Sequence, residues 1–201
     1  MVAIIDYDAG NIRSVEKALQ FLGEETCITR DRHMIRKADR VILPGVGAFG
    51  EAMKKLRSYD LVAAIQEVAD SGTPFLGICL GLQLLFESSE ESRGERGLGI
   101  LPGRIVRFPE SPACKVPHVG WNSLQFPQPG RLFQGIEEGA YVYFVHSYYL
   151  QAQQEEIVKA TTQYGVRVHA AVEKGNVFAC QFHPEKSSEV GLTILKNFMA
   201  V

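Results

Sequence analysis

The stretch GTPFLGICLGLQLLFE, residues 72–87, contains the pattern that decides the fold. It begins with a short apolar run typical of a buried strand and continues, from Leu80, with apolar residues at helical spacing. Gly77 and Gly81 stand two residues before and two residues after Cys79. Because side chains at these places would collide with neighbouring backbone, glycines there permit a sharp strand-to-helix turn. The pattern predicts a nucleophile elbow with cysteine in place of serine.

The first half of the chain alternates between short apolar runs and helical patterns. Helices are expected over 11–23 and about 49–70, the second with a break near Ser58. Short buried strands are expected over 2–6, 25–29, 38–45 and 73–79, and a further helix starts at 80–87. This alternation predicts βαβ units, and therefore an α/β fold with a mostly parallel sheet covered by helices on both faces.

The second half has a different pattern. A polar stretch over 88–97 is expected to be a surface loop, and an amphipathic helix is expected over 188–200. Between them, strands are expected over 103–108, 140–151, 156–164, 167–175 and 177–183. Glycine-containing turns join several of these strands, so antiparallel additions to the sheet are expected. With no linker or repeat in the sequence, residues 1–201 are expected to form a single domain.

Composition excludes several classes of protein. Hydrophobic residues make up 46% and charged residues 22% of the chain, as in ordinary globular proteins. The net charge of −2 and the lack of a basic run argue against nucleic acid or an anionic membrane as partner. The N-terminal apolar run is too short and too acidic for a signal peptide, and no run is long enough to span a bilayer. The four cysteines have no C-x-x-C spacing, so we expect a cytoplasmic protein with reduced thiols, no metal and no cofactor.

Cys79 has two interpretations on the local pattern alone. At the N-terminus of a helix, the dipole favours a thiolate, and the N–H of Leu80 would point toward an oxyanion formed on a substrate. Free cysteines are also among the most buried residues, so a structural Cys79 stays open at this point. Cys27 and Cys180 lie in predicted strands and are expected in the core.

A thiolate nucleophile needs a proton-shuttling partner, usually a histidine held by an acid. His183 ends a predicted buried strand in FACQFHPEKS, and Glu185 follows two residues later. In an extended chain these two side chains share one side, so the carboxylate can hold one imidazole nitrogen while the other faces Cys79. An isolated His-Pro-Glu favours a plain strand end with a solvated Glu185. Together with the elbow, it predicts a Cys-His-Glu triad.

The two motifs, FLGICLGLQLLFE and QFHPEKS, resemble those of the class I (triad) glutamine amidotransferases. Within that family, five further segments are similar, in order, to the glutaminase subunits of imidazole glycerol phosphate synthase: IIDYDAGNIRSV, VILPGVGAF, GLGILPGRIVRF, KVPHVGWN and YFVHSYY. The resemblance covers essentially the whole chain. Most class I relatives carry a P-G-G run where this chain has LPGVG (43–47), so that segment discriminates well.

The resemblance implies a flavodoxin-like class I glutamine amidotransferase fold. It implies hydrolysis of L-glutamine to glutamate and ammonia through a thioester on Cys79, with His183 as acid and base and Glu185 orienting it. Leu80 would supply one oxyanion donor, and the second is carried over to Val46 or Gly47. Since glycine tolerates unusual backbone angles, a peptide flip in this segment is a hypothesis for switching the oxyanion hole.

The resemblance also implies a substrate pocket and a partner. Glutamine's amino-acid end would be held by Gln83, His146, Ser147 and Tyr148. A (β/α)8-barrel cyclase would receive the ammonia and make imidazole glycerol phosphate and AICAR for histidine biosynthesis. The docking surface would include Pro117, His118, Trp121, Asn122 and Lys186. Without the family match, YFVHSYY fits a partly buried edge strand equally well, and a lone Trp121 fits the core better.

Three other functions are considered for this chain. The chain can serve another synthase, such as pyridoxal phosphate synthase. It can be a stand-alone cysteine hydrolase of similar fold, which would need neither PHVGWN nor a glutamine pocket. It can be an inactive regulatory module, although the intact Cys79, His183 and Glu185 argue against that.

Overall fold

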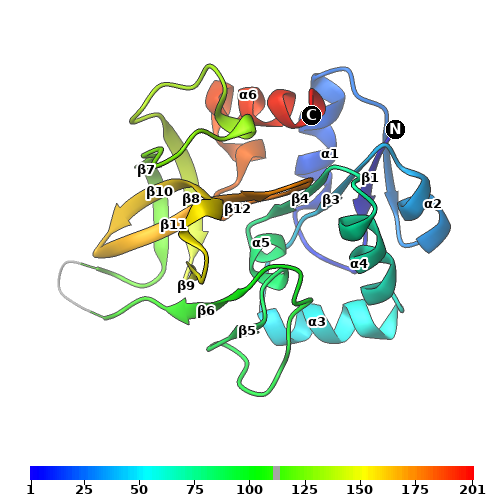
Figure 1. Ribbon diagram of the computed structural model, residues 1–201, viewed down its shortest axis with the longest axis horizontal. Coiled ribbons are helices and arrows are strands. Elements are labelled where there is room, and N and C mark those ends of the chain that lie inside the picture. The colour runs from blue at the N-terminus through cyan, green and yellow to red at the C-terminus, as the bar shows by residue number, and fades with distance from the viewer. Residues whose placement is uncertain (111–113) are drawn as a thin grey trace.

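Seven strands form the central sheet, in the order β10-β11-β12-β4-β3-β1-β2 (Figure 1). The computed structural model describes residues 1–110 and 114–201. Five neighbouring strands are parallel, and β10 and β11 extend the sheet antiparallel beyond β12, as predicted. The strands are β1 (Val2–Ile5), β2 (Thr26–Thr29), β3 (Arg40–Leu43), β4 (Phe75–Ile78), β10 (Val158–Tyr164), β11 (Val166–Lys174) and β12 (Val177–Cys180).

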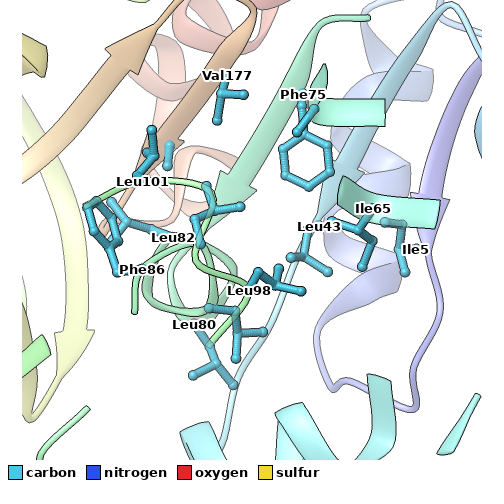
Figure 2. Close-up of a cluster of buried hydrophobic side chains, with 14 of the residues drawn as sticks. Ile5, Leu43, Ile65, Phe75, Leu80, Leu82, Phe86, Leu98, Leu101 and Val177 are labelled. Carbon is cyan, nitrogen blue, oxygen red and sulfur yellow. The ribbon is translucent and has the colours of Figure 1, made fainter. Parts of the chain in front are cut away.

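Helices cover both faces of this sheet, so the inner strands β1, β4 and β12 are apolar along their whole length. Alternate strand residues enter two separate cores. Ile5, Leu43 and Phe75 pack with α3 (Phe49–Ser58), α4 (Val62–Asp70) and α5 (Leu80–Leu84). Figure 2 shows these three side chains in one cluster with Ile65 of α4 and with Leu80 and Leu82 of α5. Ile4, Ile42 and Leu76 pack on the other face, with α1 (Ile12–Phe21) and α6 (Ser188–Met199). Within the described ranges, no helix is long and apolar enough to cross a membrane.

Two small sheets carry much of the second half of the chain. One contains β5 (Ser88–Ser89), β6 (Gly103–Arg107) and β9 (Tyr148–Ala152), and the other contains β7 (His118–Ser123) and β8 (Tyr141–His146). The single strand predicted over 140–151 is therefore wrong. The chain changes sheets at Ser147, since β8 pairs with β7 and β9 pairs with β6.

Other element boundaries also differ from the prediction. The strand predicted over 177–183 ends at Cys180, and the 3-10 helix η3 (Pro184–Lys186) follows soon after it. Helix α2 (Arg32–Lys37) and strand β7 were not predicted, because their polar sequences lack a clear apolar period. Cys180 is fully buried, as predicted, whereas Cys27 is only half-buried.

Candidate active site

Cys79 lies in the turn between β4 and α5, with φ 55° and ψ −109°. A positive φ in a residue with a side chain is strained and is typical of functional sites. A Cβ on Gly81 would lie 1.8 Å from the carbonyl oxygen of Leu43, and one on Gly77 would lie 2.8 Å from the carbonyl oxygen of Gly81. The close backbone approach therefore requires both glycines, and the sharp turn follows the predicted elbow.

A cavity of about 320 Å³ opens beside Cys79. Residues from five separate parts of the chain line it: Val46, Gly47, Cys79, Leu80, Gln83, Glu91, Pro117, Val145, His146, Ser147 and Tyr148. All four residues expected to bind glutamine are among them. Cys79 is only 7% exposed, so the cavity is its route of access to solvent.

His183 and Glu185 form a buried pair beneath this cavity. His183 Nδ1 lies 2.7 Å from Glu185 Oε1, and the two side chains are 1% and 0% exposed. The 3-10 turn of η3 brings them together, so the extended geometry used in the prediction is wrong although the contact is as expected. Asn11 Nδ2 also donates to Glu185 Oε1, at 2.6 Å. Sequence reasoning missed Asn11, whose position in the chain is remote from Glu185.

The charge state of His183 is set by its neighbours. Burial disfavours the imidazolium, but Cys79 and the Glu185 carboxylate favour it more strongly and raise the pKa of His183 to about 10. His183 Nε2 has no hydrogen-bond partner among the described residues. At neutral pH the arrangement therefore favours a protonated His183 imidazole next to the sulfur.

Backbone contacts hold η3 against β8. The N–H of His183 donates to the Tyr143 carbonyl at 2.9 Å, and Ser187 Oγ donates to the His183 carbonyl at 2.7 Å. Ser187 Oγ in turn accepts from the N–H of Tyr143 at 2.9 Å. Both the main-chain N–H and the main-chain carbonyl of His183 are thus hydrogen-bonded.

The expected oxyanion donors lie around Cys79, but one of them is engaged. The N–H of Leu80 donates to the carbonyl of Gly45 at 3.2 Å. The hydroxyl of Tyr7 donates to the carbonyl of Pro44 at 2.9 Å, and a Cβ on Gly45 would lie 2.2 Å from that hydroxyl. Gly47 has φ 103°, in the left-handed region that favours glycine. In this conformation the Leu80 N–H is not available to a substrate.

Sequence reasoning missed two polar residues near the nucleophile. Gln181 is fully buried, and its Nε2 donates to Cys79 Sγ at 3.7 Å. Its signal was a glutamine inside the apolar run FACQFH, because a buried amide must find partners. Glu91 lies in the stretch predicted as a surface loop, yet it lines the cavity, and its Oε2 accepts from the N–H of Phe49 at 2.8 Å.

Gln83 connects the nucleophile side of the cavity to its opposite wall. Its Nε2 donates to the Gln181 side-chain oxygen at 3.0 Å and to the Tyr148 carbonyl at 3.1 Å. His146 is buried, and its Nδ1 lies 2.8 Å from the same carbonyl. Two of the predicted glutamine-binding residues, Gln83 and His146, therefore both contact the backbone of a third, Tyr148.

The residues expected at a docking surface differ in their exposure to solvent. Trp121 is 50% exposed, so it does not belong to the core. Pro117 and Lys186 are also exposed, and Asn122 is half-buried. His118, in contrast, is only 3% exposed, so its side chain does not face solvent.

Trp121 belongs to an apolar face of the β7–β8 sheet. Val119, Trp121, Tyr141 and Val145 are all exposed large hydrophobic residues, and the register places them on one side of the sheet. Soluble proteins rarely leave such a group of side chains uncovered without a function. We call these four residues the β7–β8 face.

Comparisons with known proteins agree with this architecture. The Glutamine amidotransferase class-I family model matches residues 3–201. "Imidazole glycerol phosphate synthase subunit HisH" from Moorella thermoacetica is 55% identical over 98% of this chain and 93% of its own length. The protein of the same name from Bacillus cereus is 54% identical over 100% of this chain and 95% of its own length.

Solved structures share the fold at low identity. A "glutamine amidotransferase" crystal structure superposes with a TM-score of 0.76 at 21% identity, covering 99% of this chain and 100% of its own. The glutaminase domain of Trypanosoma brucei CTPS, with bound acivicin, gives 0.68 at 17% identity, covering 99% and 93%. The family model and the two relatives show that the chain belongs to the class I glutamine amidotransferases and, within them, to the family of the imidazole glycerol phosphate synthase subunit HisH.

Proposed function

We propose that this chain is the glutaminase subunit of an imidazole glycerol phosphate synthase. It hydrolyses L-glutamine and delivers the ammonia to a (β/α)8-barrel cyclase, which makes imidazole glycerol phosphate and AICAR for histidine biosynthesis. The observation that carries the proposal is a cysteine on a strained elbow, at a cavity and next to a buried His183–Glu185 pair. The relatives' name supplies the synthase. In this proposal residues 1–201 form a single glutaminase domain, and the protein is cytoplasmic.

Each triad residue has one task in the proposed reaction. The sulfur of Cys79 attacks the side-chain amide carbon of glutamine and forms a γ-glutamyl thioester, while His183 gives its proton to the departing ammonia. His183 then removes a proton from water, which attacks the thioester carbon and releases glutamate and the thiol. Glu185 orients the imidazole and stabilises its positive charge.

Glutamine's amino-acid end is a zwitterion and needs groups of both polarities. Glu91 is the only acidic residue lining the described cavity, so we assign it to the ammonium group. Gln83, Ser147 and the backbone at Tyr148 can pair with the carboxylate and with the remaining ammonium hydrogens. The side-chain amide would then extend toward Cys79.

The oxyanion hole needs a change of backbone before it can work. The tetrahedral intermediate requires the Leu80 N–H, which now donates to Gly45. We propose that the peptides of residues 45–47 turn, which releases Leu80 and directs the N–H of Val46 or Gly47 at the substrate. Crystal structures with bound glutamine, with and without the cyclase's ligand, test this step. An unchanged backbone at 45–47 in every state would contradict it.

The β7–β8 face, with the exposed Pro117 and Lys186 beside it, is the proposed docking surface for the cyclase; the side chain of Asn122 lies on the other side of β7. A half-exposed tryptophan suits the centre of an interface, where large aromatic side chains contribute most of the binding energy. Docking near the mouth of the cavity would also keep the ammonia out of bulk water.

One set of assays tests the function. Glutaminase activity is measured for the chain alone, with the cyclase, and with the cyclase plus its nucleotide ligand. We expect low, low and high activity. High activity of the chain alone would reject a coupled subunit. Cys79→Ala should abolish turnover while the complex still forms, and retained turnover would reject the triad.

A further inference from the structure

A chain of hydrogen bonds runs from β7 to the wall of the cavity. Asn122 Nδ2 lies 3.3 Å from His118 Nε2, and His118 Nδ1 lies 3.0 Å from His146 Nε2. His146 Nδ1 lies 2.8 Å from the carbonyl oxygen of Tyr148. The two histidines belong to neighbouring strands, because His118 pairs directly with His146 across β7 and β8.

Backbone groups at both ends fix the direction of this chain. The Tyr148 carbonyl can only accept, so His146 Nδ1 carries a proton and the Nε2 of a neutral His146 accepts from His118 Nδ1. At the other end, Asn122 Oδ1 accepts from the N–H of Ser123 at 2.8 Å. Its Nδ2 donates to the Gln163 carbonyl at 3.0 Å and has a second hydrogen for His118 Nε2. Every proton along the chain is thereby assigned.

The surroundings keep both imidazoles neutral. His118 stacks between Phe144 and Tyr164, with ring centroids 4.7 Å and 3.9 Å away. Burial lowers the pKa of His118 to about 4 and the pKa of His146 to about 3. A charged ring would have two donor nitrogens and would break the directed chain.

The chain ends at a carbonyl that organises the cavity. The Tyr148 carbonyl accepts from His146 and also from Gln83, the residue that connects to Gln181 and Cys79. It lies just after Ser147, where the main chain leaves one sheet for another. The Ser147 carbonyl accepts from the N–H of Phe108 at 3.2 Å, and the His146 ring supplies the second anchor of this corner.

We propose that Asn122 and His118 are positioning residues for glutamine binding. They hold His146 as the neutral Nδ1–H tautomer, and this tautomer fixes the wall formed by residues 146–148. They touch neither the substrate nor Cys79. The inference rests on the proposed glutaminase function, because glutamine is the ligand whose binding it concerns.

The tautomers give a direct test. In the full chain labelled with 15N-histidine and bound to the cyclase, a long-range 1H–15N spectrum at neutral pH should show His118 and His146 as neutral Nδ1–H forms. A proton on Nε2 of either ring, or a charged ring, would overturn the proposal. Asn122→Asp replaces the donor to His118 with an acceptor, so His118 Nε2 should gain a proton; an Nε2 that stays unprotonated would also overturn the proposal.

Glutamine binding gives the second test. Calorimetry on the complex with a Cys79→Ala background removes turnover from the measurement. His118→Phe keeps an aromatic ring in the stack but deletes both hydrogen bonds, and should weaken glutamine binding roughly tenfold. His118→Gln retains a donor and an acceptor and should recover most of that loss. Tyr164→Phe keeps the ring over His118 and should bind normally.

The outcomes separate the two proposals. If the Cys79→Ala complex with an intact chain of hydrogen bonds binds no glutamine, the proposed function fails. If it binds glutamine and His118→Phe binds equally well, the positioning role alone fails. Should His118→Phe not fold, Asn122→Asp at saturating cyclase provides the same comparison. In the active enzyme, the variants should raise the KM for glutamine and change kcat less than twofold, since the hydrogen bonds of Asn122 and His118 are made to neither Cys79 nor the His183–Glu185 pair.

Discussion

The two sides of the Cys79 elbow differ in how far their groups are arranged for the proposed reaction. On one side, the His183–Glu185 pair is buried, hydrogen-bonded to Asn11 and held by Tyr143 and Ser187. On the other side, the segment Pro44–Gly47 has a glycine at positive φ, and its Gly45 carbonyl occupies the Leu80 N–H. The proposed acid and base are therefore in place, whereas the proposed oxyanion hole is not formed. Turnover should therefore be limited by the backbone of residues 45–47 rather than by formation of the triad.

The largest effect on activity is expected for a change in the His183–Glu185 pair. His183→Ala removes the proton shuttle and should lower the glutaminase kcat of the complex by about four to six orders of magnitude, as for other triads. Steady-state assays of ammonia release check this. His33→Ala, at an exposed position in α2, is the matched control and should retain full activity. A loss of less than tenfold in His183→Ala would show that another base does the work.

Glu185→Gln should have a smaller effect, because the ring keeps a hydrogen-bonding neighbour but loses a negative charge. We expect a decrease in kcat of about 10² to 10⁴. Without the carboxylate the pKa of His183 should fall from about 10, as an NMR titration can measure. Because the pKa of His183 is higher in the folded than in the unfolded chain, its protonation stabilises the fold below the unfolded value, near 6.5, and this contribution is lost as the pH rises toward 10.

The pH dependence of unfolding gives the corresponding control. Between about pH 6.5 and 10, the free energy of unfolding should fall with pH more steeply in the parent chain than in Glu185→Gln. Chemical denaturation at a series of pH values measures both slopes. Equal slopes would show that Glu185 does not stabilise the imidazolium.

Substitutions at Gly81, beside the nucleophile, and at Gly47, in the oxyanion segment, compare a tightly packed backbone with one that has free space. Gly81→Ala puts a Cβ against the Leu43 carbonyl and should lower the free energy of unfolding by about 3 kcal/mol or more. Gly47 has open space around its Cα but φ 103°, so Gly47→Ala should cost only about 1–2 kcal/mol. Urea denaturation compares the two. A larger loss for Gly47→Ala would reverse the assignment of the rigid side.

The smallest effect is expected at Tyr7. Tyr7→Phe removes the hydrogen bond to the Pro44 carbonyl that holds the segment in its present state. Since one hydrogen bond contributes about 1 kcal/mol, partner-independent glutaminase activity should rise by about fivefold. Activity with cyclase and ligand should change little, as the segment has then already turned. Decreased activity of the chain alone would mean that Tyr7 supports the active backbone.

The sequence predicted the elbow at Cys79 and the contact between His183 and Glu185 well, because both depend on residue types at short spacing. Gly77, Cys79 and Gly81 specify their own turn, and His183 reaches Glu185 within three residues. The family resemblance named Gln83, His146, Ser147 and Tyr148, and all four line the cavity. The alternating first half predicted the sheet for the same local reason.

What the sequence did not predict depends on contacts between distant segments. The change of sheets at Ser147 is decided by which strands β8 and β9 find as partners, so one apolar run looked like one strand. The approach of Asn11 to Glu185 and of Gln181 to Cys79 requires the folded sheet. The engagement of Leu80 by Gly45 is a property of one conformation, which no residue pattern specifies.

The contact between Gly81 and Leu43 has an evolutionary consequence. It joins the start of α5 to the last residue of β3, immediately before the segment that we propose turns. No side chain fits at position 81, so natural variation there is closed to the enzyme. Val46 is exposed and Gly47 has open space beside it. Selection for a stronger or weaker response to the partner therefore has room in the oxyanion segment, while the nucleophile's own position stays fixed.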